Sequence, residues 1–280
     1  MNIDEIDMTT AESVSSMTES DAFAEGVTFF AYNIVPVIFS TIIAIGFIGN
    51  SLVIIVIVLN KKMRSTTNYL ILNLAAIDLM YVATNMPLVV IFVYDNNSWR
   101  FGNVMCKLWS FQNDISLVAS AYTLVMMSIE RYMAVVHPFS TIRFRTEKNI
   151  IRAISYLWVF AIVSCIHSLF IHHEVTDTLI DGGTIYYYQT CTFVKGINKT
   201  ANSLWDFFFT FAFPIFVMLA LYSLMLHKLW FDMGNIRGQR NEAGLVSVTK
   251  TVITVVIVFI ICLAPSKILV FLEVNLLVIE

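Results

Sequence analysis

A carboxylate and a guanidinium stand side by side at Glu130 and Arg131, in the stretch SIERYMAVVHPF (128–139). They follow fifteen residues, 115–129, that carry no formal charge. At the edge of an apolar environment, a neighbouring carboxylate can hold an Arg in a charge-assisted hydrogen bond. The pair therefore predicts a switch in which the Arg either folds onto its acid or extends into an opening between helices. The alternative is an interfacial anchor whose side chain reaches the lipid headgroups.

Asp78 is a second charged residue in an apolar setting. It lies within the segment 68–94, which contains no Lys or Arg. An ionisable residue inside a membrane is costly and by default functional. We expect a functional polar site there. The alternative is a protonated Asp that is hydrogen-bonded to a neighbouring helix.

Other chemistry is hard to find in the sequence. His172 and His173 form a lone pair without further metal ligands, so no metal site is predicted. We recognise no phosphate loop and no nucleophile–base pair, which makes an enzyme the least favoured reading. A transporter or channel would predict inverted repeats or helices broken at matching positions of two halves, and we find neither.

The elements that carry these residues must be apolar. Of the 280 residues, 58% are hydrophobic and 13% are charged, against about 25% charged in a typical soluble domain. Residues 1–33 hold seven acids and no Lys or Arg, which leaves 17 bases against 13 acids in the remainder. That tail has neither the apolar core nor the cleavage site of a signal peptide. We predict a disordered acidic tail, 1–33, joined to a membrane-embedded body.

The body divides into apolar segments that are each long enough to cross a bilayer. They are residues 35–59, 68–94, 104–136, 153–173, 207–227 and 248–272. We therefore predict an all-α membrane protein whose bundle of six helices spans residues 34–272. The last residues, 273–280, are too short to span and are expected on the outer side.

Basic residues predict the orientation of the bundle. The loops and helix ends that follow the first, third and fifth segments hold 12 of the 17 Lys and Arg residues. Lys and Arg concentrate on the cytoplasmic side of membrane proteins. The N-terminal tail is therefore predicted to be extracellular.

Two glycosylation acceptor patterns and two cysteines agree with that orientation. Asn96 and Asn198 each begin an Asn-x-Ser/Thr sequence in a loop that is predicted to lie outside. Cys106 and Cys191 also lie on that oxidising side, where a disulfide would persist.

Seven motifs then occur in one order along the chain. They are GNSLV (49–53), NLAAIDL (73–79), WRFG (99–102) with Cys106, SIERYMAVVHP (128–138), Trp158, FAFP (211–214) with Tyr222, and FIICLAP (259–265). Their order and spacing resemble rhodopsin-like (class A) G-protein-coupled receptors, in the peptide-receptor branch that includes somatostatin, opioid, galanin and allatostatin receptors. The resemblance covers about residues 34–270. It implies a rhodopsin-like helical bundle with six of the seven transmembrane helices present.

The resemblance implies roles for matching positions. The core polar cluster that holds a sodium ion corresponds to Asn50, Asp78 and Ser120. The switch and the G-protein contact correspond to Glu130, Arg131, Tyr132, Pro138, Phe139 and Tyr222. Pro214 and Pro265 correspond to helix hinges, because proline frees backbone carbonyls. Trp158 is expected to be structural.

At the outer end the resemblance guides the choice of ligand contacts. Asn113 occupies the position where amine receptors of the family carry an Asp, and the adjacent Asp114 points about 100° away on a helix. An amine ligand is therefore disfavoured. The predicted ligand-binding residues are Gln112, Asn113, Asp114, Asp206 and Lys267. For Asp206 and Lys267 the alternative is that each side chain reaches outward to the headgroups.

The segment 184–193, TIYYYQTCTF, alternates β-branched and aromatic residues, which predicts a hairpin strand. Peptide receptors of this family have such a hairpin as a lid over a wide cavity. The alternative is an unstructured loop.

Three positions depart from the family pattern. Leu263 stands where the family usually has a Trp, and no acid occupies the position near Leu245 where some relatives lock Arg131. The chain also stops at Glu280, without a seventh segment. We expect a truncated product or partial gene model that does not signal alone, which a robust peptide response from these residues would contradict.

The leading hypothesis is a G-protein-coupled receptor for an extracellular (neuro)peptide in the plasma membrane. Its expected partners are that peptide, a heterotrimeric G protein, the lipid bilayer and other receptor chains in an oligomer, with no nucleic acid. No cofactor is expected beyond an allosteric sodium ion at Asp78. The alternative is a truncated, non-signalling form that associates with a full-length receptor and modulates it.

Overall fold

The computed structural model describes most of the membrane-embedded body. The described residues are 30–95, 98–181, 184–194, 196, 198–233, 253–254, 257–265 and 267–269. The predictions on the acidic tail up to residue 29, on Asn96, on Leu245 and on residues 273–280 lie outside this set.

Helices make up most of the described chain. In order they are η1 (Phe30–Ile34), α2 (Val35–Leu59), η2 (Lys61–Met63), α3 (Thr66–Tyr94), α4 (Gly102–Val136), α5 (Glu147–Cys165), α6 (Ser168–Ile171), α7 (Lys199–Asp206), η3 (Phe207–Ala212) and α8 (Phe213–Met233). A further helix includes residues 257–265 and 267–269. The strands β1 (His172–Asp181) and β2 (Thr184–Phe193) lie between α6 and α7.

Several helices begin earlier than their apolar segments because polar side chains cap them. The Thr146 side chain accepts a hydrogen bond from the Asn149 backbone N–H, so α5 starts at Glu147 rather than at the predicted residue 153. Asn198 likewise accepts from the Ala201 N–H at the start of α7. A side-chain oxygen at this position satisfies a backbone donor that the helix leaves open.

Four helical stretches of the described chain are long and apolar enough to cross a membrane. They are Val35–Leu59, Thr66–Tyr94, Glu147–Ile171 and Lys199–Lys228. A shorter apolar helix covers Ile257–Leu269. α4 is longer than any of these, at 35 residues, and it carries charged residues near both ends. It tolerates them because it lies inside the bundle.

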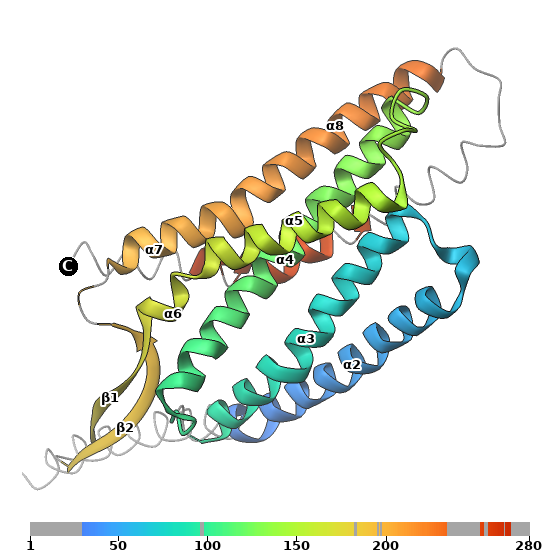
Figure 1. Ribbon diagram of the computed structural model, residues 1–280. Helices are drawn as coiled ribbons and strands as arrows, with labels where there is room; N and C mark the ends of the chain where they lie inside the picture. The colour runs from blue at the N-terminus through green and yellow to red at the C-terminus, as the bar shows by residue number, and fades with distance from the viewer. Residues whose placement is uncertain are drawn as a thin grey trace, which may run out of the picture.

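Figure 1 shows α2, α3, α4, α5 and α8 side by side, with the hairpin at the end where α4 begins. α4 contacts α3, α5 and α8. One core cluster joins α3, α4 and α8 through Leu70, Leu124, Val125, Met127, Met218, Tyr222 and Met225. A second joins α3, α4 and α5 through Ile77, Ile115, Val118, Ala119, Ala161 and Cys165. α4 is therefore the axis of the described bundle.

The hairpin prediction is confirmed. β1 and β2 pair antiparallel, with His172 opposite Phe193 and Asp181 opposite Thr184. β2 has the predicted bounds, whereas the first two residues of β1, His172 and His173, were included in the predicted helix 153–173. That helix ends instead at Cys165, and the short α6 connects it to β1.

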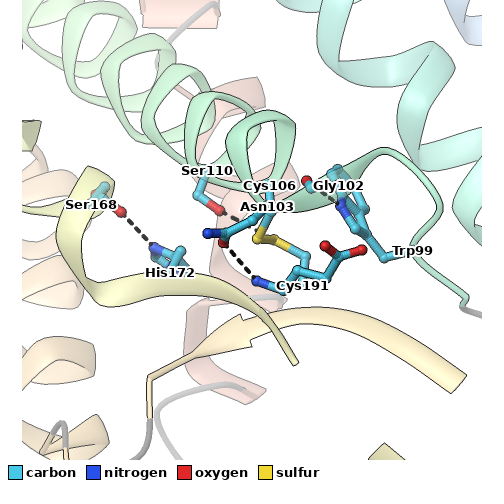
Figure 2. The surroundings of a disulfide bond; sticks show 9 residues. Trp99, Gly102, Asn103, Cys106, Ser110, Ser168, His172 and Cys191 are labelled. Carbon is cyan, nitrogen blue, oxygen red and sulfur yellow. Dashed lines mark hydrogen bonds between the residues drawn. A yellow bond between two sulfur atoms is a disulfide. The ribbon is translucent and has the colours of Figure 1, made fainter. Parts of the chain in front are cut away.

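A disulfide ties the hairpin to the start of α4. Cys106 and Cys191 are bonded, as predicted, and Figure 2 shows their surroundings. The Asn103 side chain accepts from the Glu174 N–H at 3.1 Å, and the Trp99 N–H donates to the Gln189 carbonyl at 2.7 Å. These contacts from both strands hold the hairpin over the end of the bundle.

A buried amide links three helices in mid-bundle. Asn73 of α3 donates to the Thr123 hydroxyl of α4 at 2.9 Å and accepts from the Trp158 indole N–H of α5 at 3.0 Å. Buried polar groups are costly when they lose their partners. Trp158 therefore has a structural contact, in line with its expected role.

Replacing Asn73 with Leu should lower the free energy of unfolding by about 1–3 kcal/mol, because Trp158 and Thr123 both lose a partner. Trp158→Phe removes one bond and should cost less. The double variant should cost less than the sum, since the two changes share one bond. Thermal unfolding in detergent measures all three, and additive effects would contradict a shared bond.

Candidate functional site

A cavity of about 290 Å³ opens at the hairpin end of the bundle, among α4, α5, α7, η3 and the hairpin. Its exposed lining is mostly apolar, and its aromatic residues are Tyr122, Phe160, Phe193, Trp205 and Phe209. Two carboxylates, Asp114 and Asp206, face it as well. An apolar, concave site with a few polar groups is typical of a ligand pocket.

A second cavity of about 220 Å³ adjoins the first and lies against the disulfide. It shares Asp114, His172 and Phe193 with the larger cavity. Trp109 lines it too, and the buried indole N–H of Trp109 has no hydrogen-bond partner among the described residues.

Two of the predicted ligand residues on α4 reach these cavities. Asp114 lines both, and its carboxylate accepts a hydrogen bond from the Ser168 hydroxyl. Asn113 lines the smaller one and accepts from the Tyr81 hydroxyl at 3.3 Å. Gln112 instead donates to the Met80 carbonyl of α3 at 3.3 Å and is not among the residues that line either cavity.

Asp206 and Lys267 form an ion pair with each other. Asp206 lines the larger cavity, and its carboxylate also accepts from the Thr210 hydroxyl at 3.3 Å. The pair joins the end of α7 to the helix that includes residues 257–265. The predicted alternative, in which each side chain reaches separately to headgroups, does not describe this geometry.

His172 is a cavity residue that the sequence did not indicate. Its Nδ1 lies 3.2 Å from the Ser168 carbonyl oxygen, as Figure 2 shows. Burial lowers the pKa of His172 below its ordinary value, because desolvation disfavours the charged form. The protonated ring is therefore less favoured here than for a histidine in water. The pair with His173 looked isolated in sequence because the cavity residues come from distant segments.

At the other end of α4, Glu130 is the centre of a buried polar cluster and is only 2% exposed. Its Oε1 accepts from Arg145 Nη2 at 2.8 Å and from the Thr66 hydroxyl at 2.8 Å. Its Oε2 accepts from the Thr67 hydroxyl at 3.0 Å. Glu130 thus ties the loop after α4 to the start of α3.

Arg131 contacts this cluster differently from the prediction. Its Nε lies 3.3 Å from Glu130 Oε2 as an ion pair, but it makes no hydrogen bond there. The guanidinium donates instead to the Thr67 hydroxyl. The predicted hydrogen-bonded Glu130–Arg131 pair is therefore replaced by an ion pair, because Arg145, Thr66 and Thr67 take the hydrogen-bonding sites of Glu130.

The other predicted switch residues lie on α4, on α8 and in the loop after α4. The Tyr222 hydroxyl lies 3.1 Å from the Ser128 hydroxyl, and Tyr132 packs against the core cluster of α3, α4 and α8. Pro138 is exposed, and Phe139 is 90% exposed. An apolar side chain this exposed is available for contact with a partner.

The predicted sodium residues lie in mid-bundle but are not joined. Asn50 donates to the Gly46 carbonyl of its own helix at 2.9 Å. Asp78 and Ser120 are half-buried. No described hydrogen bond links any two of the three. The Asp78 carboxylate and the Ser120 hydroxyl supply oxygen ligands, which hard cations such as sodium prefer. The residue types therefore fit a sodium ion, but the described side chains do not form a closed ion site.

Pro214 is fully buried at the second residue of α8. The turns before it, Phe207–Ala212, are π-helical, as expected where proline lacks the N–H of a regular helix. Pro265 ends the described stretch 257–265. A further proline, Pro87, lies inside α3.

Asn198 has a second use beside its acceptor pattern, since its Oδ1 caps α7 at 3.0 Å from the Ala201 N–H. A glycan would attach to the other side-chain atom, the amide nitrogen. We expect Thr200→Ala to remove the glycan and keep the cap. Asn198→Asp should do the same, and Asn198→Gln should lose both and cost about 1 kcal/mol of stability. Gel mobility after glycosidase treatment and thermal unfolding separate the two effects. An unchanged mobility of Thr200→Ala would contradict glycosylation here.

Apolar helices of spanning length, packed around a central helix, make the chain a multi-pass membrane protein. A family model described as "7 transmembrane receptor (rhodopsin family)" matches residues 49–277. The chain therefore belongs to the rhodopsin family of seven-transmembrane receptors. This confirms the resemblance found in the motifs, the rhodopsin-like helical bundle and the absence of an enzyme function, because members of the family are receptors.

The relatives include receptors named for peptides. The allatostatin-A receptor of Bombyx mori is 35% identical over 239 residues, which are 84% of this chain and 65% of that protein. Melanin-concentrating hormone receptor 1 of Sus scrofa is 31% identical, over 84% of this chain and 66% of that protein. Galanin receptor type 2 of Mus musculus is 27% identical, over 85% and 62%. The chain thus spans slightly less than two thirds of the length of these relatives.

Proposed function

We propose that the chain is part of a plasma-membrane receptor that binds an extracellular peptide and activates a heterotrimeric G protein. In this proposal the N-terminus and the hairpin face the cell exterior. The observation that carries the proposal is the distribution of groups along α4. Cavity residues such as Asp114 lie toward one end and the Glu130–Arg131 cluster lies at the other.

A signal between the ends has to travel along the bundle. Asp114 and Arg131 are 17 positions apart on one helix, or about 25 Å at 1.5 Å per residue. A ligand that alters the contacts of α4 with α5 and α8 would change the population of two arrangements at the inner end. In the active arrangement Arg131 leaves Thr67 and Glu130 and faces the G protein.

Tyr222 and Phe139 have defined parts in this proposal. Tyr222 exchanges its contact with Ser128 for one beside the extended Arg131. Phe139, already exposed, forms the apolar contact with the G protein. Pro214 serves as a hinge in α8, and Pro265 serves as a hinge for the outward movement of the helix that includes residues 257–265.

A sodium ion at Asp78 would supply a positive charge to the carboxylate, with Ser120 and Asn50 as neighbouring oxygen donors. Bound there, it would favour the inactive arrangement. The support is the carboxylate itself, which forms no ion pair among the described residues.

The proposal is tested by binding and by nucleotide exchange. Detergent-solubilised chain is screened against a panel of synthetic amidated peptides, including an allatostatin-A peptide. Nucleotide exchange is then measured on a chimera in which residues 1–277 continue into the C-terminal part of the Bombyx mori receptor. We expect a peptide that binds both proteins, drives exchange in the chimera, and does not drive exchange when Arg131 is replaced by Ala. Peptide binding with full exchange in Arg131→Ala would overturn the proposed switch, and failure of every peptide to bind would overturn the proposed ligand class.

A further inference from the structure

The larger cavity contains one carboxylate, that of Asp114, which forms no ion pair with a described Lys or Arg. Asp114 lines both cavities, and its hydrogen-bond donors are neutral. They are the Ser168 hydroxyl and, at 3.5 Å, the Asn113 amide. In the described part of the chain no Lys or Arg forms an ion pair with it.

The other charged groups near Asp114 form no ion pair with it in the described part of the chain. Asp206 repels it, and the cation nearest to Asp206, Lys267, is already paired with that carboxylate. Lys199 lines the larger cavity but makes no described ion pair. His172 lies beside Asp114, and burial lowers the pKa of its ring, which disfavours the protonated form.

The remaining walls suit a cation. Tyr122 and Phe160 pack edge to face with ring centroids 5.1 Å apart, and both line the larger cavity with Asp114. Aromatic faces attract ammonium and guanidinium groups, more strongly where water is excluded. The unpaired Trp109 N–H in the adjoining cavity is a donor for a carbonyl next to such a group.

We propose that Asp114 binds a basic group of the ligand, a guanidinium or ammonium on a peptide side chain or a terminal amine. This inference rests on the proposed function, since it specifies the ligand class of the same cavity. Asp114 is then a specificity-determining residue, and Asn113, at the position of the amine-receptor Asp, is not. A ligand with a carboxylate at this point would be repelled by both Asp114 and Asp206.

The charge of Asp114 can be measured without knowing the peptide. A reporter thiol, Ser203→Cys, is placed in the cavity wall of a chain that also carries Cys165→Ala and Cys262→Ala. Rates of modification are compared for the cationic 2-aminoethyl and the anionic 2-sulfonatoethyl methanethiosulfonate. We expect the cation-to-anion rate ratio to fall by about tenfold in Asp114→Asn, because a charged cleft concentrates counter-ions by at least that factor.

Two variants make this result specific. Asp114→Glu keeps the charge and should keep the ratio, while Asp177→Asn removes an exposed carboxylate of β1 and should leave it unchanged. If the cation-to-anion rate ratio were equal in the parent and in Asp114→Asn, the side chain of Asp114 would carry no charge and the inference would be wrong.

The second arm uses the peptides that bind in the screen above. Each Arg is replaced by citrulline and each Lys by norleucine, which keep size and remove charge. One replacement should lower affinity by about 100-fold in the parent, as expected for a charge pair away from water. In Asp114→Asn the basic and neutral peptides should bind alike. Binding peptides whose affinity depends on no basic group would overturn the inference and leave the proposed function intact. If no peptide binds, the proposed function fails, and the thiol rates still report the charge of Asp114.

Discussion

Glu130→Gln should raise nucleotide exchange in the absence of ligand by about tenfold, a coupling of roughly 1.4 kcal/mol between two arrangements. The physical reason is that Glu130 is the only anion of the described inner cluster. It receives hydrogen bonds from Arg145, Thr66 and Thr67 and pairs with Arg131. The neutral amide keeps the shape of the side chain but loses both ion pairs, so Arg131 is freed to extend. Exchange is measured in the chimera with purified G protein.

A variant of Arg145 tests whether this residue also stabilises the inactive arrangement, or whether the Glu130–Arg131 ion pair does so alone. Arg145→Gln should raise basal exchange by a smaller factor, since Arg131 keeps its own ion pair. Glu147→Gln changes an exposed carboxylate on the same side of the bundle, whose one side-chain hydrogen bond among the described residues is from the Tyr69 hydroxyl at 3.3 Å, and it should have no effect. Basal exchange in Glu130→Gln equal to that of the parent, at equal folded amount, would rule out the lock.

Lys267→Glu should lower the free energy of unfolding by about 2 kcal/mol, because it sets two carboxylates against each other where an ion pair stood. In the structure Lys267 pairs with Asp206 across the outer end of the bundle, and the two side chains are 15% and 33% exposed. This partial exposure keeps the effect below that of a fully buried pair. For a chain of this size the change corresponds to a fall of about 6 °C in the unfolding temperature.

The exchanged pair, Asp206→Lys with Lys267→Glu, tests whether the effect comes from this contact. It should recover most of the stability that the single variant loses, since the two charges meet again with reversed signs. Thermal unfolding in detergent, followed by a thiol-reactive dye on Cys165, gives the comparison. No recovery in the double variant would mean that Lys267 acts through a different contact.

Local sequence patterns predicted the bounds of a helix or strand well where the pattern continues along the whole element. The apolar run 35–59 matches α2, since most of this helix faces lipid and only Ile57 is buried. The alternation of 184–193 matches β2 in both bounds. α5 is different because its first turns are polar. Its apolar run marks only the part inside the membrane, and its start depends on the Thr146 cap.

Contacts between distant residues were beyond such patterns. Nothing in the sequence pairs Ser168 with Asp114, 54 positions away, or places Asp206 against Lys267, 61 positions away. Arg145 is one of the bases that follow the third apolar segment, and its bond to Glu130 depends on the course of residues 137–146 after α4. The motifs therefore indicated where the functional residues of α4 lie, and only the fold showed which distant residues contact them.

The resemblance to receptors and the membrane-spanning bundle are confirmed, whereas the roles of individual residues stay predictions. The Cys106–Cys191 disulfide is present. Asp78, Asn50 and Ser120 stay a predicted ion site, because the described side chains do not join them. Arg131 is near its acid as expected, but its hydrogen bond is to Thr67.

The orientation of the bundle is the claim on which the whole account depends, and labelling with a membrane-impermeant maleimide tests it most directly. Single cysteines are introduced at Tyr187, on the hairpin, and at Ser140, in the loop after α4, in cells that express the chain with Cys165 and Cys262 replaced by Ala. We predict that intact cells label Tyr187→Cys and leave Ser140→Cys unlabelled until the membrane is permeabilised. Labelling of Ser140→Cys on intact cells, with Tyr187→Cys protected, would place the cavity inside the cell and contradict the account.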